Sequence, residues 1–382
     1  MTKYRSVYRS ILLSALVICM GIANEAAAAP PAYTVTDLGT LGGTFSAGYG
    51  INASGQVAGY SFTTGFASVH AFLYDGTMHD LGEGTGYGIN DGGQVTGRSG
   101  SDHAFLYDGT MNDLGTLGGA SSEGRGINAS GQVAGYSRTT GDAAFHAFLY
   151  DGTLNDLGTL GGTHSIGLGI NDSGQVTGDS NSTGGEIHAF LYDGTMHDLG
   201  TLGGGQSGGV GINASGQVTG YSVTTGDVEQ HAFLYDGTMH DLGTLGGANS
   251  YGNGINASGQ VVGDSQLTGG GRHAFLYTSG SGIVDLNSLF DSLSGWQLSV
   301  GNAINDAGQI TGFGQIGGET HAFLLNPVPE PATLALMVLG LPFLIGRNVR
   351  RFGTGRLLSV RRIARAAAAP AVAGARSDQR LF

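Results

Sequence analysis

Short apolar segments separated by glycine-rich turns recur between residues 33 and 326. The segment HAFLY, residues 70–74 in its first copy, alternates so that His, Phe and Tyr share one face while Ala and Leu share the other. The dipeptide Asp75-Gly76 follows and predicts a two-residue hairpin, with Thr77–Leu81 as the returning strand. Apolar residues on both faces indicate strands of a sheet packed between two neighbours.

Four sequence landmarks repeat seven times in this region: an Asp-Leu pair, a Gly-Ile-Asn string, a Gly-Gln-Val-like string and His-Ala-Phe. Successive copies of His-Ala-Phe are 33 to 48 residues apart. A period near 42 residues is typical of propellers and solenoids. Between Gly-Ile-Asn and Gly-Gln-Val, residues such as 52–55 predict a tight turn that Asn52 starts and in which Gly55 has a positive φ.

The repeated region starts and stops within a unit. It begins with the Asp-Leu strand Tyr33–Leu41 and ends with the His-Ala-Phe strand His321–Asn326, so each end lacks the partner that the other supplies. We therefore predict an all-β fold, a seven-bladed β-propeller closed by the N-terminal strand. The alternative is an open β-solenoid, which would need distinct capping repeats. The second unit is about ten residues short and lacks the Thr-Leu-Gly-Gly string, so we expect trimmed loops there.

The N-terminal segment, residues 1–29, predicts a secretory signal peptide. Lys3, Arg5 and Arg9 precede an apolar run over residues 11–23, and small residues follow at 26–29. An uncleaved membrane anchor is the alternative, but the run is short for a membrane span. The single cysteine, Cys19, lies in this segment, which excludes a disulfide framework and a Cys-based zinc site.

Charge separates the centre of the chain from its C-terminal end. Residues 33–326 contain four arginines and 26 acidic residues, a net charge of −22, whereas residues 327–382 carry a net charge of +7. An acidic body repels phosphate backbones, which argues against nucleic acid as a partner. A basic end beside an apolar run is typical of membrane targeting.

Residues 327–351 resemble the PEP-CTERM sorting signal of Gram-negative bacteria. The resemblance rests on the triplet Pro329, Glu330 and Pro331, an apolar run over residues 333–345, and an arginine cluster formed by Arg347, Arg350 and Arg351. It implies export, a membrane helix over residues 332–346 that anchors the protein transiently or stably in the cell envelope, and processing by an exosortase. A buried core helix is the alternative. The run is short and contains a proline, and an Ala/Arg-rich tail, residues 352–382, continues beyond the cluster.

The repeated strings over residues 33–326 resemble the HAF family of bacterial extracellular repeats. That resemblance implies a location outside the cell, often together with a PEP-CTERM signal. It assigns no activity to particular residues.

Repeated histidines and aspartates are the candidate polar side chains of the body. Imidazole and carboxylate suit a metal ion, but a feature that obeys the repeat favours one structural hydrogen bond in each unit, as in WD-type propellers. Three further histidines, His79, His197 and His240, directly precede such an aspartate. The repeated residues are His70, His103, His146, His188, His231, His273 and His321, with Asp80, Asp113, Asp156, Asp198 and Asp241.

Signatures of catalysis and of cofactors are missing from the sequence. It has no Gly-x-Ser-x-Gly, His-Glu-x-x-His or phosphate-binding Gly-Lys-Ser/Thr motif, and residues 33–326 contain no lysine. The Asn-rich turns make calcium an alternative, although no loop has the acid spacing of an EF-hand, and Asx turns explain the same residues. The least repetitive stretch, residues 285–300 with Trp296, is expected to be a packing insertion, with a ligand-binding lip as the alternative.

These observations predict an exported, exosortase-sorted surface or matrix protein. Its repeat domain is expected to act as a binding or structural module in exopolysaccharide or a biofilm matrix, with polysaccharide or another surface protein as partner. The alternatives are an extracellular glycan-active hydrolase with acids at the propeller mouth, a calcium-dependent adhesin, and a coat protein without a ligand.

Overall fold

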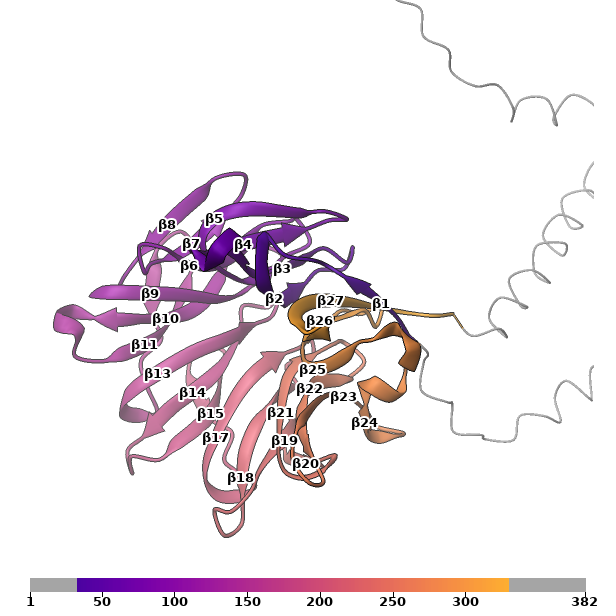
Figure 1. Ribbon diagram of the computed structural model, residues 1–382. Coiled ribbons are helices and arrows are strands. Elements are labelled where there is room, and N and C mark those ends of the chain that lie inside the picture. The colour runs from indigo at the N-terminus through magenta and orange to yellow at the C-terminus, as the bar shows by residue number, and fades with distance from the viewer. Residues whose placement is uncertain (1–32, 330–382) are drawn as a thin grey trace, which may run out of the picture. The chain divides into compact units, whose positions relative to one another are not determined.

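The computed structural model describes residues 33–329. They form an all-β, propeller-like array of 27 strands with four short 3-10 helices (Figure 1). The predicted signal peptide and most of the predicted sorting segment, including residues 332–346, lie outside the described residues. Within residues 33–329, no helix is long and apolar enough to cross a membrane.

Each repeat forms one antiparallel sheet of four strands. The first sheet holds β2 (Gly42–Ile51), β3 (Val57–Thr63), β4 (Val69–Tyr74) and the start of β5 (Met78–Ile89). The second holds the end of β5, β6 (Val95–Ser99), β7 (Ala104–Tyr107) and β8 (Met111–Gly115). The third holds β9 (Gly118–Ile127), β10 (Val133–Thr139), β11 (Phe145–Tyr150) and β12 (Leu154–Asp156).

The remaining sheets follow in chain order. The fourth holds β13 (Gly161–Ile170), β14 (Val176–Ser182), β15 (Ile187–Tyr192) and β16 (Met196–Asp198). The fifth holds β17 (Gly203–Ile212), β18 (Val218–Thr224), β19 (Gln230–Tyr235) and β20 (Met239–Gly243). The sixth holds β21 (Gly246–Ile255), β22 (Val261–Leu267), β23 (Arg272–Thr278) and β24 (Gly282–Asp285). The seventh holds β25 (Gln297–Ile304), β26 (Ile310–Ile316), β27 (Glu319–Pro327) and β1 (Tyr33–Asp37).

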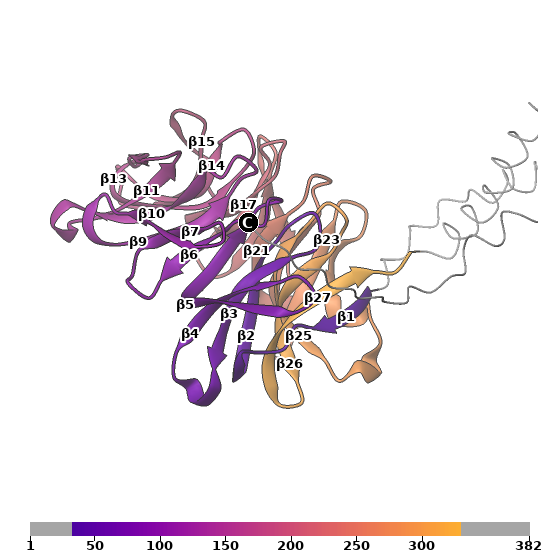
Figure 2. The ribbon, with the colours of Figure 1, turned by 90° about the horizontal axis from the view of Figure 1, so that it is seen from above.

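The two ends of the repeated region meet, as their incomplete sequences predict. Strand β1 pairs with β27 in antiparallel register from Tyr33↔Pro327 to Asp37↔Phe323 (Figure 2). A single parallel bridge, Phe45↔Thr320, links the next strand, β2, to β27 as well. The last sheet therefore takes its fourth strand from the beginning of the chain, and β27 has no free edge.

Two sides of the array can be distinguished from the course of the chain. The first strand of each unit ends in Ile-Asn, and these residues from all seven units line one common cavity, so the first strand is the innermost. We call the side with the Asn turns the turn face. The opposite side, where the chain passes from one unit to the next and where second and third strands connect, is the crossover face.

Packing between neighbouring sheets forms the core. Each His-Ala-Phe phenylalanine is fully buried, and each lies in an apolar cluster shared by two consecutive units. Phe72 of the first unit, for example, packs with Val57 of its own sheet and with Leu38 and Ala322 of the seventh. The seven clusters thus include one that joins the last unit to the first. The phenylalanines are Phe72, Phe105, Phe148, Phe190, Phe233, Phe275 and Phe323.

Close approach of two strands explains one repeated glycine. Gly59 lies beneath the ring of Phe72, and a Cβ at this position would overlap both that ring and the carbonyl oxygen of Ala47 on the neighbouring strand. Glycine is required here for space, because any side chain would separate the first and second strands.

A closed cycle of hydrogen bonds connects the seven Asn turns. In each unit the side-chain amide of the asparagine donates to the main-chain carbonyl of the next unit's asparagine, at distances of 2.9 to 3.2 Å. The series returns to its origin, since Asn305 donates to Asn52. Its members are Asn52, Asn90, Asn128, Asn171, Asn213, Asn256 and Asn305.

Each of these asparagines also fixes its own turn. Asn52 donates to the Gln56 side chain at 2.8 Å, and its side-chain oxygen accepts the Gln56 main-chain N–H at 2.9 Å. Gly55 closes the turn at φ 83° and donates its N–H to the Asn52 carbonyl at 3.0 Å. One buried amide therefore satisfies the turn and ties it to the next unit.

The Asp-Gly turns differ from the sequence prediction. Tyr74 pairs with Met78, so three residues rather than two connect these strands, and the returning strand starts at Met78 instead of Thr77. Gly76 has a φ of 118°, outside the left-handed helical values that a type I′ turn uses. The Asp-Gly dipeptide predicted the position of the hairpin correctly, but the predicted connection is one residue too short.

Two irregular regions have a structural explanation. In the second unit, the missing Thr-Leu-Gly-Gly string lets β5 run without interruption from the outermost strand of one sheet to the innermost strand of the next. Residues 285–300 form 3-10 helices η3 (Leu286–Ser288) and η4 (Ser292–Ser294), and Trp296 packs edge-on against Phe323 at 6.2 Å in the core.

Removing one asparagine of the cycle should lower stability markedly. Asn213→Ala deletes the bonds to the Asn256 carbonyl and to Gln217, leaving buried polar groups unpaired, so we expect a loss of about 2–4 kcal/mol in unfolding free energy. Asn213→Asp keeps the acceptor, loses the donor, and should also destabilise. The exposed Ser215→Ala is the control, expected within about 0.5 kcal/mol of wild type in urea unfolding. A loss as small as that control for both Asn213 variants would show that the cycle adds nothing.

Candidate functional site

All seven repeated histidines are hydrogen-bonded to the aspartate of their own sheet's outermost strand. His70 Nδ1 lies 2.8 Å from Asp80 Oδ1, and the same carboxylate accepts the N–H of Gly82 at 2.8 Å. His273 pairs in this way with Asp285, and His321 pairs with Asp37, so the closing strand completes the set. The other pairs are His103–Asp113, His146–Asp156, His188–Asp198 and His231–Asp241.

The three additional histidines do not bond to the aspartate that follows each of them in the sequence. Each bonds instead to the aspartate of the preceding hairpin turn. His79 Nε2 lies 2.8 Å from Asp75 of the hairpin turn, and His197 and His240 contact Asp193 and Asp236 in the same way. These hydrogen bonds lower the pKa of the three turn carboxyls. The pairs are exposed and repeat the same local geometry.

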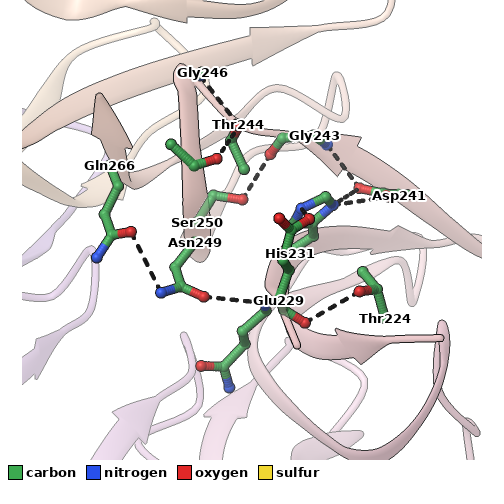
Figure 3. A network of polar contacts seen from close by, with 12 residues as sticks. Thr224, Glu229, His231, Asp241, Gly243, Thr244, Gly246, Asn249, Ser250 and Gln266 are labelled. Carbon is green, nitrogen blue, oxygen red and sulfur yellow. Dashed lines mark hydrogen bonds and ion pairs between the residues drawn. The ribbon is translucent and has the colours of Figure 1, made fainter. Parts of the chain in front are cut away.

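Figure 3 shows how such a pair sits at the junction between the fifth and sixth units. Asp241 accepts from His231 and from the N–H of Gly243. Ser250, from the next unit, donates to the Gly243 carbonyl at 2.6 Å and accepts the N–H of Ala232 at 2.8 Å. The His–Asp pair joins the third strand to the outermost strand of the same sheet, close to where the chain crosses to the next sheet.

The His–Asp pairs are not arranged as the ligands of a metal ion would be. Among residues 33–329, no three His, Asp or Glu side chains converge closely enough to hold an ion. In the fourth, fifth and seventh units a glutamate also lies 3.4 to 3.6 Å from Nε2 of the repeated histidine. Each histidine there lies between two carboxylates, one on each ring nitrogen.

Two sets of residues depart from the repeat. In the innermost strands the residue before the last Gly or Ala varies from unit to unit, whereas the Ile-Asn that follows does not. Arg98, Arg138 and Arg272 lie at the ends of strands nearest the crossover face, whereas Arg125, the fourth arginine of the body, lies near the turn-face end of β9. The varying residues are Tyr49, Tyr87, Arg125, Leu168, Val210, Asn253 and Asn302.

Aromatic side chains form a continuous series on the first unit, which we call the aromatic track. It begins at Phe66, a loop residue that is 58% exposed, and continues through Phe62 and Phe45 to Tyr60. Tyr60 stacks on Tyr49, and the inner end of the track is the contact between Tyr49 and Tyr87, with ring centroids 5.3 Å apart. Burial, together with Tyr49, raises the pKa of Tyr60 to about 12, so these phenols are neutral.

A buried ion pair adjoins the inner end of the track. Arg125 Nε lies 2.7 Å from Glu123 Oε1, and Tyr136 donates its hydroxyl to Glu123 at 2.9 Å. The Arg125 guanidinium carbon lies 4.1 Å from the centroid of the Tyr87 ring. Burial, the largest single influence, lowers the pKa of Arg125, but Glu123 together with Tyr87 and Tyr136 shifts it upward, so the net effect raises the arginine pKa. Such a pair must be kept intact, because losing either partner leaves an uncompensated buried charge.

The other three arginines are held in different ways. Arg98 contacts Asp102 at 2.7 Å, and Arg272 contacts Asp264 at 2.6 Å. Arg138 lies over the ring of Phe145 at 4.2 Å and forms no ion pair within the described part of the chain.

A carboxyl group with a strongly shifted pKa lies in the middle of β14, the second strand of the fourth unit. Burial raises the pKa of Asp179 to about 6. Burial and the nearby Asp179 charge raise the pKa of Tyr221 to about 12.

Sequence reasoning missed the asparagine cycle and the aromatic track. Aspartate and asparagine start an Asx turn equally well. The first position of all seven turns is nevertheless asparagine, which indicates that its side-chain N–H donates a hydrogen bond. The track could have been located by the first unit, in which Phe45 and Phe62 occupy strand positions that carry mainly polar residues in the other units. Of the predicted sorting residues only Pro329 is among the described residues, and Cys19 lies outside them.

Substituting Asp179 should change how stability depends on pH. The folded-state pKa of about 6 exceeds the unfolded value of about 3.9, so the folded protein binds this proton more tightly and unfolding free energy falls as pH rises from about 4 to about 6. Above that range, Asp179→Asn should be more stable than wild type by on the order of 1–2 kcal/mol, and the gain should vanish near pH 4.

Urea unfolding at several pH values measures this difference, with the exposed Asp108→Asn as the control. A stability gain that is the same at pH 4 and above pH 7 would contradict the assignment.

Comparison with solved structures shows only distant likeness. A fungal lectin from Aleuria aurantia, described as a six-bladed β-propeller with a fucose recognition mode, is 16% identical, with 77% of this chain and 99% of that chain covered and a TM-score of 0.35. A Trypanosoma rangeli sialidase bound to 2,3-difluorosialic acid is 9% identical, with 77% and 58% covered and a TM-score of 0.37. A Bacteroides thetaiotaomicron protein of unknown function is 12% identical, with 77% and 76% covered and a TM-score of 0.38.

No curated protein sequence matches this chain. One family does match at its C-terminal end: residues 327–351 correspond to the PEP-CTERM protein-sorting motif. The chain therefore carries the sorting signal of an exported, exosortase-processed protein of the bacterial cell envelope.

Proposed function

We propose that this protein is a surface-retained, polysaccharide-binding module of the envelope or extracellular matrix. In this proposal the seven sheets are the blades of a closed seven-bladed β-propeller, and the repeats are those of the HAF family. The pairing of β1 with β27 and the asparagine cycle support the closed ring. The membrane helix over residues 332–346 would keep the exported body at the envelope until exosortase cuts.

The observation that carries the binding proposal is the aromatic track. It runs from the exposed Phe66, in the loop between β3 and β4, inward to Tyr49 and Tyr87. Flat aromatic surfaces with a few polar groups at one end are typical of sites that bind extended ligands bearing apolar and hydroxyl patches. A series of neighbouring rings along one unit suits a chain-like sugar polymer.

The net charge of the body limits the class of polysaccharide that we expect it to bind. The body carries a net charge of −22, and three of its four arginines are already paired with carboxylates. Long-range repulsion therefore disfavours uronic-acid or phosphate polymers. Neutral or amine-bearing polysaccharides are the class that this surface accommodates.

The hydrolase alternative gains no support at the mouth of the central cavity. The acids there are Asp91, Asp172 and Asp306, and each accepts a main-chain N–H from the preceding unit. These hydrogen bonds give all three a structural role.

Binding is tested with a panel of neutral, amine-bearing and anionic polysaccharides and the purified exported protein. Phe66→Ala with Tyr60→Ala should weaken binding to the best polymer at least tenfold, because the ring faces are removed, as measured by co-sedimentation. The control is Val228→Ala, an 80% exposed apolar residue in the corresponding loop of the fifth unit. Equal binding by the double variant and the control would refute the track as the ligand surface.

Sorting is tested separately. Replacing Pro329, Glu330 and Pro331 with Ala should abolish exosortase cleavage, leaving a membrane-held precursor of higher mass on fractionation. A mature form of unchanged mass in that variant would refute the role of the triplet. The apolar run is left intact, so loss of export itself is not expected.

A further inference from the structure

A cavity of about 370 Å³ opens between the first and second units, next to the inner end of the aromatic track. Its volume falls within the range of small-molecule sites, about 300–1,000 Å³. It is larger than the cavity of about 270 Å³ at the asparagine cycle, where the amides already bond to one another. The lining residues are Val69, Glu83, Gly84, Thr85, Tyr87, Arg98, Ser99, Gly100 and Asp102.

The cavity exists because the second unit is short. At five junctions a serine of the incoming innermost strand fills this position and bonds to the preceding sheet, as Ser250 does. At this junction Gly84 takes the place of that serine. The short connection between β6 and β7, residues 100–103, also leaves space that longer loops occupy elsewhere. The hollow is therefore not a repeated by-product of the architecture.

The residues that line the cavity are mostly polar, and one of their carboxylates has no partner within residues 33–329. Arg98 is paired with Asp102 at 2.7 Å, whereas the exposed Glu83 side chain makes no ion pair or hydrogen bond within residues 33–329. Hydroxyls of Thr85, Ser99 and Tyr87 complete the wall. The residues that line the cavity thus carry one net negative charge.

We propose that this cavity binds one amine-bearing sugar residue, with its ammonium group at Glu83 and its ring hydroxyls at the Arg98–Asp102 pair. Carboxylate and guanidinium groups side by side can accept from and donate to neighbouring hydroxyls of one ring. An anionic sugar would face two carboxylates against a single, already paired arginine. A purely apolar ligand would leave these groups without partners.

This inference rests on the proposed function in one respect: it names the class of sugar residue that binds next to the inner end of the aromatic track. Tyr87 belongs to both, because its ring closes the track and also lines the cavity. A polymer lying along the track would then present one amine-bearing residue to the hollow.

The test is a calorimetric titration of the purified exported protein with D-glucosamine, and with N-acetylglucosamine and glucose as neutral analogues. We expect saturable binding of glucosamine, at least tenfold weaker binding of both analogues, and at least tenfold weaker glucosamine binding by Glu83→Gln. Glu229→Gln, which removes an exposed carboxylate at the same face of the fifth unit, should bind like wild type. Because Glu83 is exposed, both variants should keep the wild-type melting temperature.

Three outcomes would overturn the proposal: no saturable glucosamine binding, equal affinity for the neutral analogues, or unchanged glucosamine binding by Glu83→Gln. The Phe66→Ala variant separates this site from the track, because it should bind free glucosamine normally while losing polymer. Polymer binding that persists without any glucosamine binding would refute the cavity alone. If the wild-type protein bound no polysaccharide, the proposed function would be refuted instead.

Discussion

The structure depends on one constraint: a four-stranded sheet with two apolar faces is stable only when both faces are covered. Each phenylalanine cluster is shared by two consecutive units, and the series includes a cluster between the seventh and the first. Hydrophobic contact is not directional, so it does not by itself fix how far one sheet is displaced along the next. The asparagine amides supply that direction, because each one must reach the carbonyl of the neighbouring turn.

Much of this arrangement follows from the sequence, because strand alternation, turn residues and the split last unit are local patterns. The pairing of Tyr33–Asp37 with β27 is an example, since two incomplete fragments complement each other. The hairpin after Tyr74 shows the limit: Asp-Gly marks a turn, but its length depends on how β4 and β5 twist against each other. Contacts across units, such as Asn52 with Asn90, involve residues 38 positions apart, and no local pattern predicts them.

The candidate site was harder to predict than the fold. The repeated His and Asp residues are visible in the sequence because they recur, and each pair is hydrogen-bonded within its own sheet. The aromatic track and the Glu123–Arg125 pair depend on Phe45, Phe62 and Arg125, which occur in only one unit each and therefore give no periodic signal in the sequence. In a repetitive chain, unique residues clustered on one face provide the functional signal, and their proximity is visible only in three dimensions.

The seam formed by β1 and β27 also orders the events of secretion. The strand that leaves the ribosome first pairs with the strand that leaves last, so the seventh sheet cannot be completed until residue 327 has been made and exported. Any product truncated upstream of β27 would present an unpaired β26 edge and an orphan first strand, which is a surface prone to aggregation and proteolysis. Only a body that includes β27 gives both β26 and β1 their partner strand, and the sorting motif that begins at residue 327 follows directly on that last strand.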